Sequence, residues 1–208
     1  IVYTSGSTGR PKGVLINHLA VMSCLSRNNK ALKLSEDDVV GEGAPFFFIA
    51  GATIVLYGLA YGMTNVLISM AAMRNPVLLA QMLSDELVTV TFISPKILRY
   101  FKPMDKRLRF VLTGSERLSG IYSDEYTIVN TYGLSESCGG LFAFFLDKAY
   151  DNTPIGLPMG DEVVYLLDEN GNVIVRSNCM ITPSRAEKIV ASGIETVRIR
   201  TILTCRSH

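Results

Sequence analysis

Short runs of aliphatic and β-branched residues alternate along this chain with longer segments whose apolar positions recur at helical spacing. The short runs predict buried strands, because a strand that is covered on both faces needs no polar side. The expected strands are residues 39–45, 64–69, 88–93, 108–112 and 127–130, and the expected helices are residues 14–31, 50–61, 75–87 and a short one from 94. Strands that alternate with helices indicate an α/β fold with a largely parallel sheet and flanking helices.

The pattern changes from Glu162 onward. Apolar residues at 163–167 and 173–175 flank a polar segment that contains Asn170-Gly171, a pair favoured in tight hairpin turns. We therefore expect an α/β core over residues 1–160 and a small β-hairpin element over residues 161–176. Residues 177–208 fit neither pattern and stay unassigned.

Composition narrows the class of protein. The chain has 208 residues, of which 48% are hydrophobic, so it can bury a sizeable core. The net charge is +1 and no run of like charges occurs, which argues against a nucleic-acid partner and against a polybasic membrane anchor. The partner is expected to be a small molecule.

Neither the apolar segments nor the cysteines indicate a membrane or metal protein. The most apolar stretch, residues 46–63, is interrupted by three glycines and lacks flanking charges, so it predicts buried core rather than a membrane span. The four cysteines show no metal-binding spacing, and we expect reduced thiols in a cytoplasmic protein. The chain starts without methionine on a strand that leads directly into a loop, and we expect it to be part of a longer protein.

A loop rich in glycine and hydroxyl groups follows the first apolar pair, and its sequence is Tyr-Thr-Ser-Gly-Ser-Thr-Gly-Arg-Pro-Lys. Glycine lets backbone N–H groups approach an anion closely, hydroxyls add donors, and Lys12 adds a mobile positive charge. The spacing excludes both the Walker loop and the dinucleotide-binding loop. The candidate phosphate ligands are Thr4, Ser5, Gly6, Ser7, Thr8, Gly9 and Lys12.

Two further polar motifs follow predicted strands. Thr113-Gly114-Ser115-Glu116 comes after the strand at 108–112, and residues 130–136 continue from the strand at 127–130 as Asn-Thr-Tyr-Gly-Leu-Ser-Glu. In an open α/β sheet, ligands bind beyond the carboxyl ends of the strands. All three motifs are therefore candidates for a single site.

Residues 3–13 resemble, almost letter for letter, the Y-T-S-G-S-T-G-x-P-K-G motif of the adenylate-forming (AMP-binding) enzymes. That superfamily includes acyl- and aryl-CoA ligases, luciferases and the adenylation domains of nonribosomal peptide synthetases. The resemblance covers about residues 1–175. It implies that a carboxylic or amino acid reacts with ATP and Mg²⁺ to give an acyl-adenylate and pyrophosphate. A thiol, either carrier-protein phosphopantetheine or CoA, would then accept the acyl group.

The resemblance also implies roles for individual residues. Lys12 and Glu136 would be catalytic, with Glu136 holding Mg²⁺. Tyr132 would stack on adenine and Ser135 would bond the α-phosphate. The nucleotide-binding set would be completed by Gly114, Ser115, Glu116, Asn130 and Gly133. His18 matches a position that is often histidine in the family, and we expect it to pack or cap rather than to perform chemistry.

Two interpretations of the acid are open. The segments after residue 112 and around 152–159 look most like peptide synthetase domains, which favours an amino acid. Such domains, however, usually carry Phe-Asp where this chain has Phe-Phe-Ile-Ala at 47–50, and the missing aspartate would leave a substrate ammonium without a counter-charge. The segment 45–51 is similar instead to that of acyl- and aryl-CoA ligases, with Phe48 in place of histidine. The candidate pocket residues are Phe47, Phe48 and Gly51.

An alternative of another class is a noncatalytic fragment that at most binds nucleotide. The family expects further motifs downstream, including an aspartate for the ribose and a lysine in a mobile C-terminal domain. Neither motif is found in this chain, and Lys188 lies in no matching segment. We therefore expect that the 208 residues alone do not adenylate efficiently.

Overall fold

The structure is a computed structural model, and it describes residues 1–4, 10–167, 173–175, 187, 190 and 198–201. The chain divides into two compact units, Ile1–Gly160 and Asp161–His208. None of the helices in the described ranges has the length and continuous hydropathy that a bilayer crossing requires.

The first unit is built on a seven-stranded sheet in the order β4-β3-β5-β6-β7-β8-β9. Its strands are β3 (Val39–Glu42), β4 (Thr64–Leu67), β5 (Val90–Phe92), β6 (Phe110–Gly114), β7 (Thr127–Leu134), β8 (Gly139–Phe145) and β9 (Leu157–Pro158). Neighbouring strands from β4 to β7 run parallel, and β8 and β9 continue the sheet antiparallel. The predicted α/β fold with a largely parallel sheet is confirmed.

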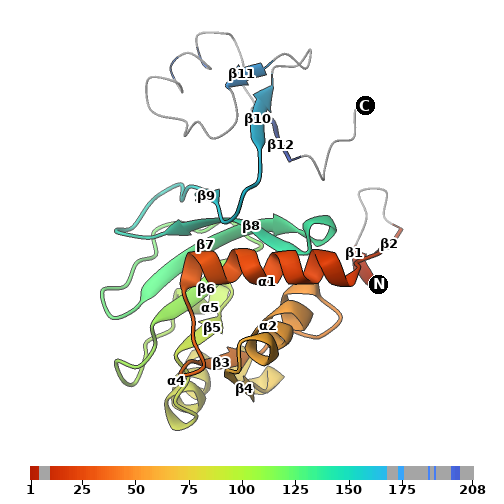
Figure 1. The fold of residues 1–208 in the computed structure, drawn as a ribbon. Helices are drawn as coiled ribbons and strands as arrows, with labels where there is room; N and C mark the ends of the chain where they lie inside the picture. Colours follow the sequence, from red (N-terminus) through yellow and green to blue (C-terminus); the bar gives the residue numbers. More distant parts are fainter. Residues whose placement is uncertain (5–9, 168–172, 176–186, 188–189, 191–197, 202–208) are drawn as a thin grey trace. The chain divides into compact units, whose positions relative to one another are not determined.

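Helices cover both faces of this sheet. The helices are α1 (His18–Leu32), α2 (Ile49–Ala60), α3 (Met70–Met73), α4 (Pro76–Asp85) and α5 (Pro95–Leu98). Leu25 and Leu32 of α1 pack with Val90 and Val129 on one face, whereas α4 and α5 pack on the other around Val111. Figure 1 shows α1 running along β8.

The first predicted helix begins later than expected. Residues Lys12–Val14 form strand β2, which pairs antiparallel with β1 (Val2–Thr4), and α1 starts at His18. Asn17 caps this helix, because its side chain accepts the N–H of Ala20 at 2.8 Å. The prediction of a helix from residue 14 was wrong, since pairing with β1 outweighed the helical spacing of Val14 and Leu15.

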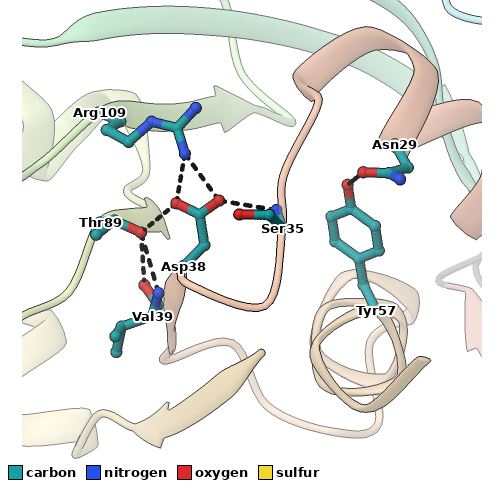
Figure 2. A network of polar contacts seen from close by, with 7 residues as sticks. All are labelled: Asn29, Ser35, Asp38, Val39, Tyr57, Thr89 and Arg109. Carbon is teal, nitrogen blue, oxygen red and sulfur yellow. Dashed lines mark hydrogen bonds and ion pairs between the residues drawn. The ribbon is translucent and has the colours of Figure 1, made fainter. Parts of the chain in front are cut away.

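A cluster around the buried carboxylate of Asp38, which we call the Asp38 network, joins the amino ends of three parallel strands. Asp38, which is only 2% exposed, accepts hydrogen bonds from Ser35 N at 3.0 Å and Thr89 Oγ1 at 2.8 Å. Arg109 Nη1 lies 2.6 and 2.7 Å from the two carboxylate oxygens (Figure 2). The network lies just before β3, β5 and β6, at the opposite end of these strands from the polar motifs.

The second unit contains a three-stranded antiparallel sheet in the order β11-β10-β12. Strands β10 (Val164–Leu167) and β11 (Val173–Val175) match the predicted hairpin strands, whereas the Asn170-Gly171 turn lies outside the described residues. Strand β12 (Arg198–Thr201) falls in the segment left unassigned by the sequence.

Candidate functional site

A cavity of about 600 Å³ opens at the carboxyl ends of β3, β5, β6 and β7. Side chains of α1, α2 and α3 close it from the sides. Of the residues predicted from the sequence, the lining includes Phe48, Ser115, Gly133 and Ser135. The motif at 113–116 (the second motif), the motif at 130–136 (the third motif) and the apolar segment after β3 therefore meet at one site. This agrees with the rule that ligands bind beyond the carboxyl ends of the strands in an open α/β sheet.

The second motif turns sharply away from the sheet at the cavity. Gly114 ends β6 and is buried against the backbone carbonyl of Thr131, so that a side chain at this position would collide with that oxygen. Ser115 follows with φ of 67°, a left-handed conformation that is uncommon for a residue with a side chain. Glu116 is exposed and its carboxylate lies 3.0 Å from Lys96 Nζ. Only Ser115 of this motif lines the cavity.

The third motif lies largely within a strand rather than after one. Strand β7 continues through Tyr132 and Gly133 to Leu134, although the sequence predicted its end at residue 130. The reason is pairing with β8, a strand that the sequence did not predict, across a bulge between Tyr132 and Gly133. A short 3₁₀ turn at Ser135–Ser137 then carries Ser135 into the cavity wall and Glu136 into solvent.

Buried polar contacts hold this turn. Arg27 of α1 donates from Nε to the carbonyl of Gly140 at 3.1 Å and from Nη2 to the carbonyl of Ser137 at 3.2 Å. Ser137 Oγ accepts the N–H of Leu134 at 3.1 Å. Asn130 is also buried and donates from Nδ2 to the carbonyl of Pro154 at 2.9 Å. The Asn130 amide is therefore engaged within the protein.

The first loop is described only at its ends. Thr4 and Lys12 are register partners in the β1-β2 hairpin, and the Lys12 side chain is exposed. The hairpin thus brings together the two ends of the predicted phosphate loop. Ser5, Gly6, Ser7, Thr8 and Gly9 lie outside the described residues.

The predicted acid-pocket residues occupy three different environments. Phe48 lines the cavity, whereas Phe47 is 71% exposed and is not among the described residues of the lining. Gly51 is buried in α2 behind the lining, where an added Cβ would lie 2.6 Å from the carbonyl oxygen of Pro45. Gly51 therefore allows the loop at 44–45 to lie against the helix.

The cavity is mainly apolar. Residues that the sequence did not single out include Met70, Met73 and Arg74 after β4, and Thr131, Gly139 and Gly140 in the β7-β8 hairpin. Among the described lining residues, Arg74 has the only charged side chain. A short four-residue helix, α3, positions the two methionines, and a segment of that length has no periodicity that could be recognised in the sequence.

One carboxyl group lies just behind the lining. Glu42 ends β3, is 2% exposed, and accepts the N–H of Ala44 through Oε1. Its Oε2 has no hydrogen-bond partner among the described residues. Burial raises the pKa of Glu42 to about 7, although the hydrogen bond from Ala44 acts in the opposite direction. Glu42 itself does not line the cavity.

His18 takes the first position of α1 and is exposed. The helix cap comes from Asn17 instead. His18 lies in a smaller apolar hollow with Met22 and Leu59, apart from the main cavity. The expected capping role of His18 is therefore wrong, because Asn17 precedes it and supplies the cap.

The cavity lies at the carboxyl ends of a parallel sheet and is lined by a glycine-containing turn and a serine, which is the place where open α/β domains bind their ligands. The sequence profile of the family described as AMP-binding enzyme matches residues 1–180. The chain belongs to this family, and the resemblance recognised in the three motifs is confirmed.

Related proteins agree with this assignment. The chain is similar to bacitracin synthase 1 of Bacillus licheniformis, with 29% identity over 171 residues that cover 82% of the chain and 3% of that protein. The Vibrio cholerae adenylation domain AlmE, solved with glycyl-adenosine-5'-phosphate, has a TM-score of 0.73 at 20% identity and matches 84% of the chain and 35% of its own.

A third similar protein is a coenzyme A synthetase. O-succinylbenzoate coenzyme A synthetase of Bacillus subtilis, solved with ATP and magnesium ion, has a TM-score of 0.68 at 21% identity, over 83% of the chain and 38% of its own. These two structural similarities establish the fold. The chain spans only a small part of the length of the curated relatives that it matches.

Proposed function

We propose that this chain contributes the nucleotide and acid sites of an ATP-dependent adenylate-forming ligase. In that reaction a carboxylate oxygen attacks the α-phosphorus of ATP, the bond to the pyrophosphate oxygen breaks, and an acyl-adenylate and pyrophosphate result. The observation that carries the proposal is the meeting of Phe48, Ser115, Gly133 and Ser135 around one cavity. Family membership supports the same reaction class.

The groups near the third motif suit a magnesium nucleotide. Glu136 presents an exposed carboxylate that forms no ion pair with any residue in the described part of the chain, and Ser135 lies one residue away in the cavity wall. Oxygen ligands of this kind are those that Mg²⁺ prefers. When bound, Mg²⁺ would neutralise charge on the triphosphate. We assign Glu136 to the metal and Ser135 to the α-phosphate.

The remaining nucleotide contacts are assigned by motif. Thr4, Lys12 and the loop between them would hold the outer phosphates, with the Lys12 ammonium stabilising charge on the transferring phosphoryl group. Tyr132, which is 41% exposed and follows the residue that pairs with Gly114, would stack on adenine. Asn130 would position this strand end rather than contact the ligand, because its amide is held by Pro154.

Substitutions at the two charged positions test the nucleotide site. Lys12→Ala and Glu136→Gln are each expected to weaken binding of ATP–Mg²⁺ by tenfold or more, roughly the value of one charge-assisted contact. Isothermal titration calorimetry on the 208-residue chain would measure the affinity. Lys102→Ala and Glu86→Gln, exposed residues outside the cavity lining, are the matched controls and should bind like wild type. Unchanged affinity in both test variants would remove the site assignment.

For the acid, we propose an apolar carboxylic acid without an α-ammonium group, activated by a domain most like those of peptide synthetases. Phe48, Ile49, Val40 and Phe92 give the cavity apolar walls, and Ile49 and Ala50 offer no carboxylate. Glu42, the acidic residue nearest in sequence to residues 48–50, is outside the cavity lining and accepts the N–H of Ala44. A buried ammonium without a counter-charge costs several kcal/mol, which disfavours an amino acid.

A matched pair of acids tests this assignment. We expect 3-phenylpropionate to bind at least tenfold more tightly than phenylalanine, which differs only by the ammonium group, in the presence of Mg²⁺ and α,β-methylene ATP. Calorimetry on the chain and on Glu42→Gln would measure both acids. Tighter binding of phenylalanine that is lost in Glu42→Gln would overturn the proposal and identify Glu42 as the counter-charge.

Two alternatives remain as separate candidates. An acyl- or aryl-CoA ligase would have the same cavity and would pass the acyl group to CoA rather than to carrier-protein phosphopantetheine. A noncatalytic domain would bind ATP–Mg²⁺ without forming an adenylate. Pyrophosphate exchange with the acid that binds best separates catalysis from binding alone, and acyl transfer from a preformed adenylate to CoA or to a carrier protein separates the two acceptors.

A further inference from the structure

One charged side chain lies in the wall of the cavity at the strand ends. Among the described lining residues only Arg74 carries a charge, and it directly follows the short helix α3. The rest of the described lining is apolar or carries neutral hydroxyl and amide groups. A ligand pocket of this kind obtains its specificity from a small number of polar groups at fixed places. Arg74 is therefore the place in the wall where an anionic group of a ligand would be recognised.

The backbone on both sides of Arg74 is held in place. Asn75, the next residue, caps helix α4 with its side chain, and Ala72 of α3 is 1% exposed within the core. Met73 packs against the end of β3, because an added Cβ on Gly43 would overlap the sulfur of Met73. The turn that carries Arg74 is thus fixed at the carboxyl ends of β3 and β4.

The guanidinium group of Arg74 is free for a ligand. The side chain is exposed, and it forms no ion pair with any residue in the described ranges. Glu42 ends the neighbouring strand β3, but its carboxylate is buried and does not pair with Arg74. A guanidinium presents five N–H donors in a planar fork, which matches the two oxygens of a carboxylate.

Arg74 and the proposed α-phosphate site lie toward opposite ends of the row of strands. The order is β4-β3-β5-β6-β7, with Arg74 beyond β4 and Ser135 beyond β7. Since neighbouring strands lie about 4.8 Å apart, β3 and β7 are separated by about 14 Å and β4 and β7 by about 19 Å. An acid whose reacting carboxylate meets the α-phosphate could therefore reach Arg74 only with its far end.

The floor between these two ends is apolar. Strands β3 and β5 contribute the register partners Val40 and Val90, and strands β5 and β6 contribute the partners Phe92 and Leu112. All four residues line the cavity. The body of a molecule that bridges the two ends would thus lie on hydrocarbon, with a charged contact beyond it.

We propose that Arg74 determines the specificity of the acid site by binding a second carboxylate at the far end of the acid, so that the substrate is a dicarboxylic acid with an apolar body. This inference rests on the proposed function, which places the reacting carboxylate beside Ser135. It keeps the apolar body and the absence of an α-ammonium group, and it adds one anionic group. Arg74 orients the acid while the other carboxylate reacts.

Matched pairs of acids test the role of Arg74. Decanedioate and its monoamide have the same length, roughly 11 Å at about 1.2 Å per bond of an extended chain, and differ in charge at one end only. Calorimetry on the 208-residue chain with Mg²⁺ and α,β-methylene ATP would measure both affinities, and the same pairs of octanedioate and dodecanedioate would bracket the length. We expect the dicarboxylate of at least one pair to bind about tenfold more tightly than its monoamide, because a guanidinium–carboxylate contact is charge-assisted.

Substitutions separate recognition by Arg74 from a structural role. In Arg74→Gln the affinity ratio of the preferred pair should fall close to the twofold statistical advantage of a symmetric diacid. Arg74→Lys keeps the charge but not the fork, so it should retain a smaller preference for the dicarboxylate. Arg107→Gln changes an exposed arginine outside the lining and should keep the wild-type ratio. A structural role alone would weaken both acids equally.

The failure of this inference can be told apart from the failure of the proposed function. If the acids bind only with the nucleotide analogue, but no pair shows a preference for the dicarboxylate, Arg74 does not recognise a second carboxylate and the proposed function stands. A preference that is unchanged in Arg74→Gln would have the same meaning. If no acid binds although ATP–Mg²⁺ does, both the proposed acid site and the role of Arg74 are wrong.

Discussion

Asp38→Ala is expected to lower the free energy of unfolding by about 3 kcal/mol, because it removes a buried carboxylate that accepts hydrogen bonds from three residues and each such bond contributes about 1.5–3 kcal/mol. The Asp38 carboxylate is 2% exposed and accepts hydrogen bonds from Ser35, Thr89 and Arg109 (Figure 2). Loss of the carboxylate removes the side-chain acceptor shared by Ser35, Thr89 and Arg109 at the amino ends of three strands, and only Thr89 keeps a second acceptor among the described residues, the carbonyl of Val39. Urea unfolding followed by circular dichroism would measure the change.

A surface ion pair in the same segment offers a matched control. Arg107 Nε lies 3.8 Å from Asp105 Oδ2, and both side chains are partly exposed. Arg107→Ala should therefore change stability by less than about 1 kcal/mol, whereas Arg109→Ala should approach the effect of Asp38→Ala. Equal effects of the two arginine substitutions would show that the Asp38 network does not stabilise the fold beyond an ordinary surface contact.

The same network predicts an acid dependence of stability. Burial alone would raise the pKa of Asp38, but hydrogen bonds from Ser35, Thr89 and Arg109 outweigh it and hold the pKa below its usual value. A carboxyl with a lower pKa in the folded state stabilises the protein above its unfolded pKa, and that contribution disappears as pH falls through the folded pKa. Asp38→Asn should remove this part of the acid dependence. Above neutral pH, its free energy of unfolding should be lower than that of the wild type.

The parallel sheet was predictable because its strands are continuous apolar runs. Strand β5, for example, lies inside the run at 88–93, and no other regular structure suits so short a β-branched segment between helices. Strand β8 was not predicted. Its sequence begins with Gly139-Gly140 and shows no alternation, so only its pairing with β7 makes it a strand. Sheet edges of this kind depend on tertiary contacts rather than on local pattern.

The part of the candidate site that lies at the carboxyl ends of strands was predictable from the sequence. Ser115 and Ser135 were placed near each other by the rule for parallel sheets, and both line the cavity. Met73 and Arg74 were not foreseen, because they reach the cavity from a four-residue helix after β4. Tyr132 and Glu116 lie outside the described lining, so their roles rest on the motif and stay predictions.

Gly133→Ala is expected to destabilise the β7-β8 hairpin that forms part of the cavity wall. Gly133 lies at the bulge where β7 meets β8, and a Cβ built there would overlap the carbonyl oxygen of Gly139. The obstacle is backbone, which cannot rotate away as a side chain can, so the hairpin must open. We expect a loss of about 3 kcal/mol or more in unfolding free energy.

Gly140, which pairs with Gly133 across the hairpin, provides the matched control for this prediction. A Cβ on Gly140 would lie 2.9 Å from the terminal methyl of Met159, a flexible group that can move aside. Gly140→Ala should therefore cost at most about 1 kcal/mol. If Gly133→Ala folds, its affinity for ATP–Mg²⁺ should fall tenfold or more, because the displaced hairpin carries Ser135 and Glu136 with it. Equal stability and equal nucleotide affinity in the two variants would contradict both the bulge geometry and the link between the hairpin and the nucleotide site.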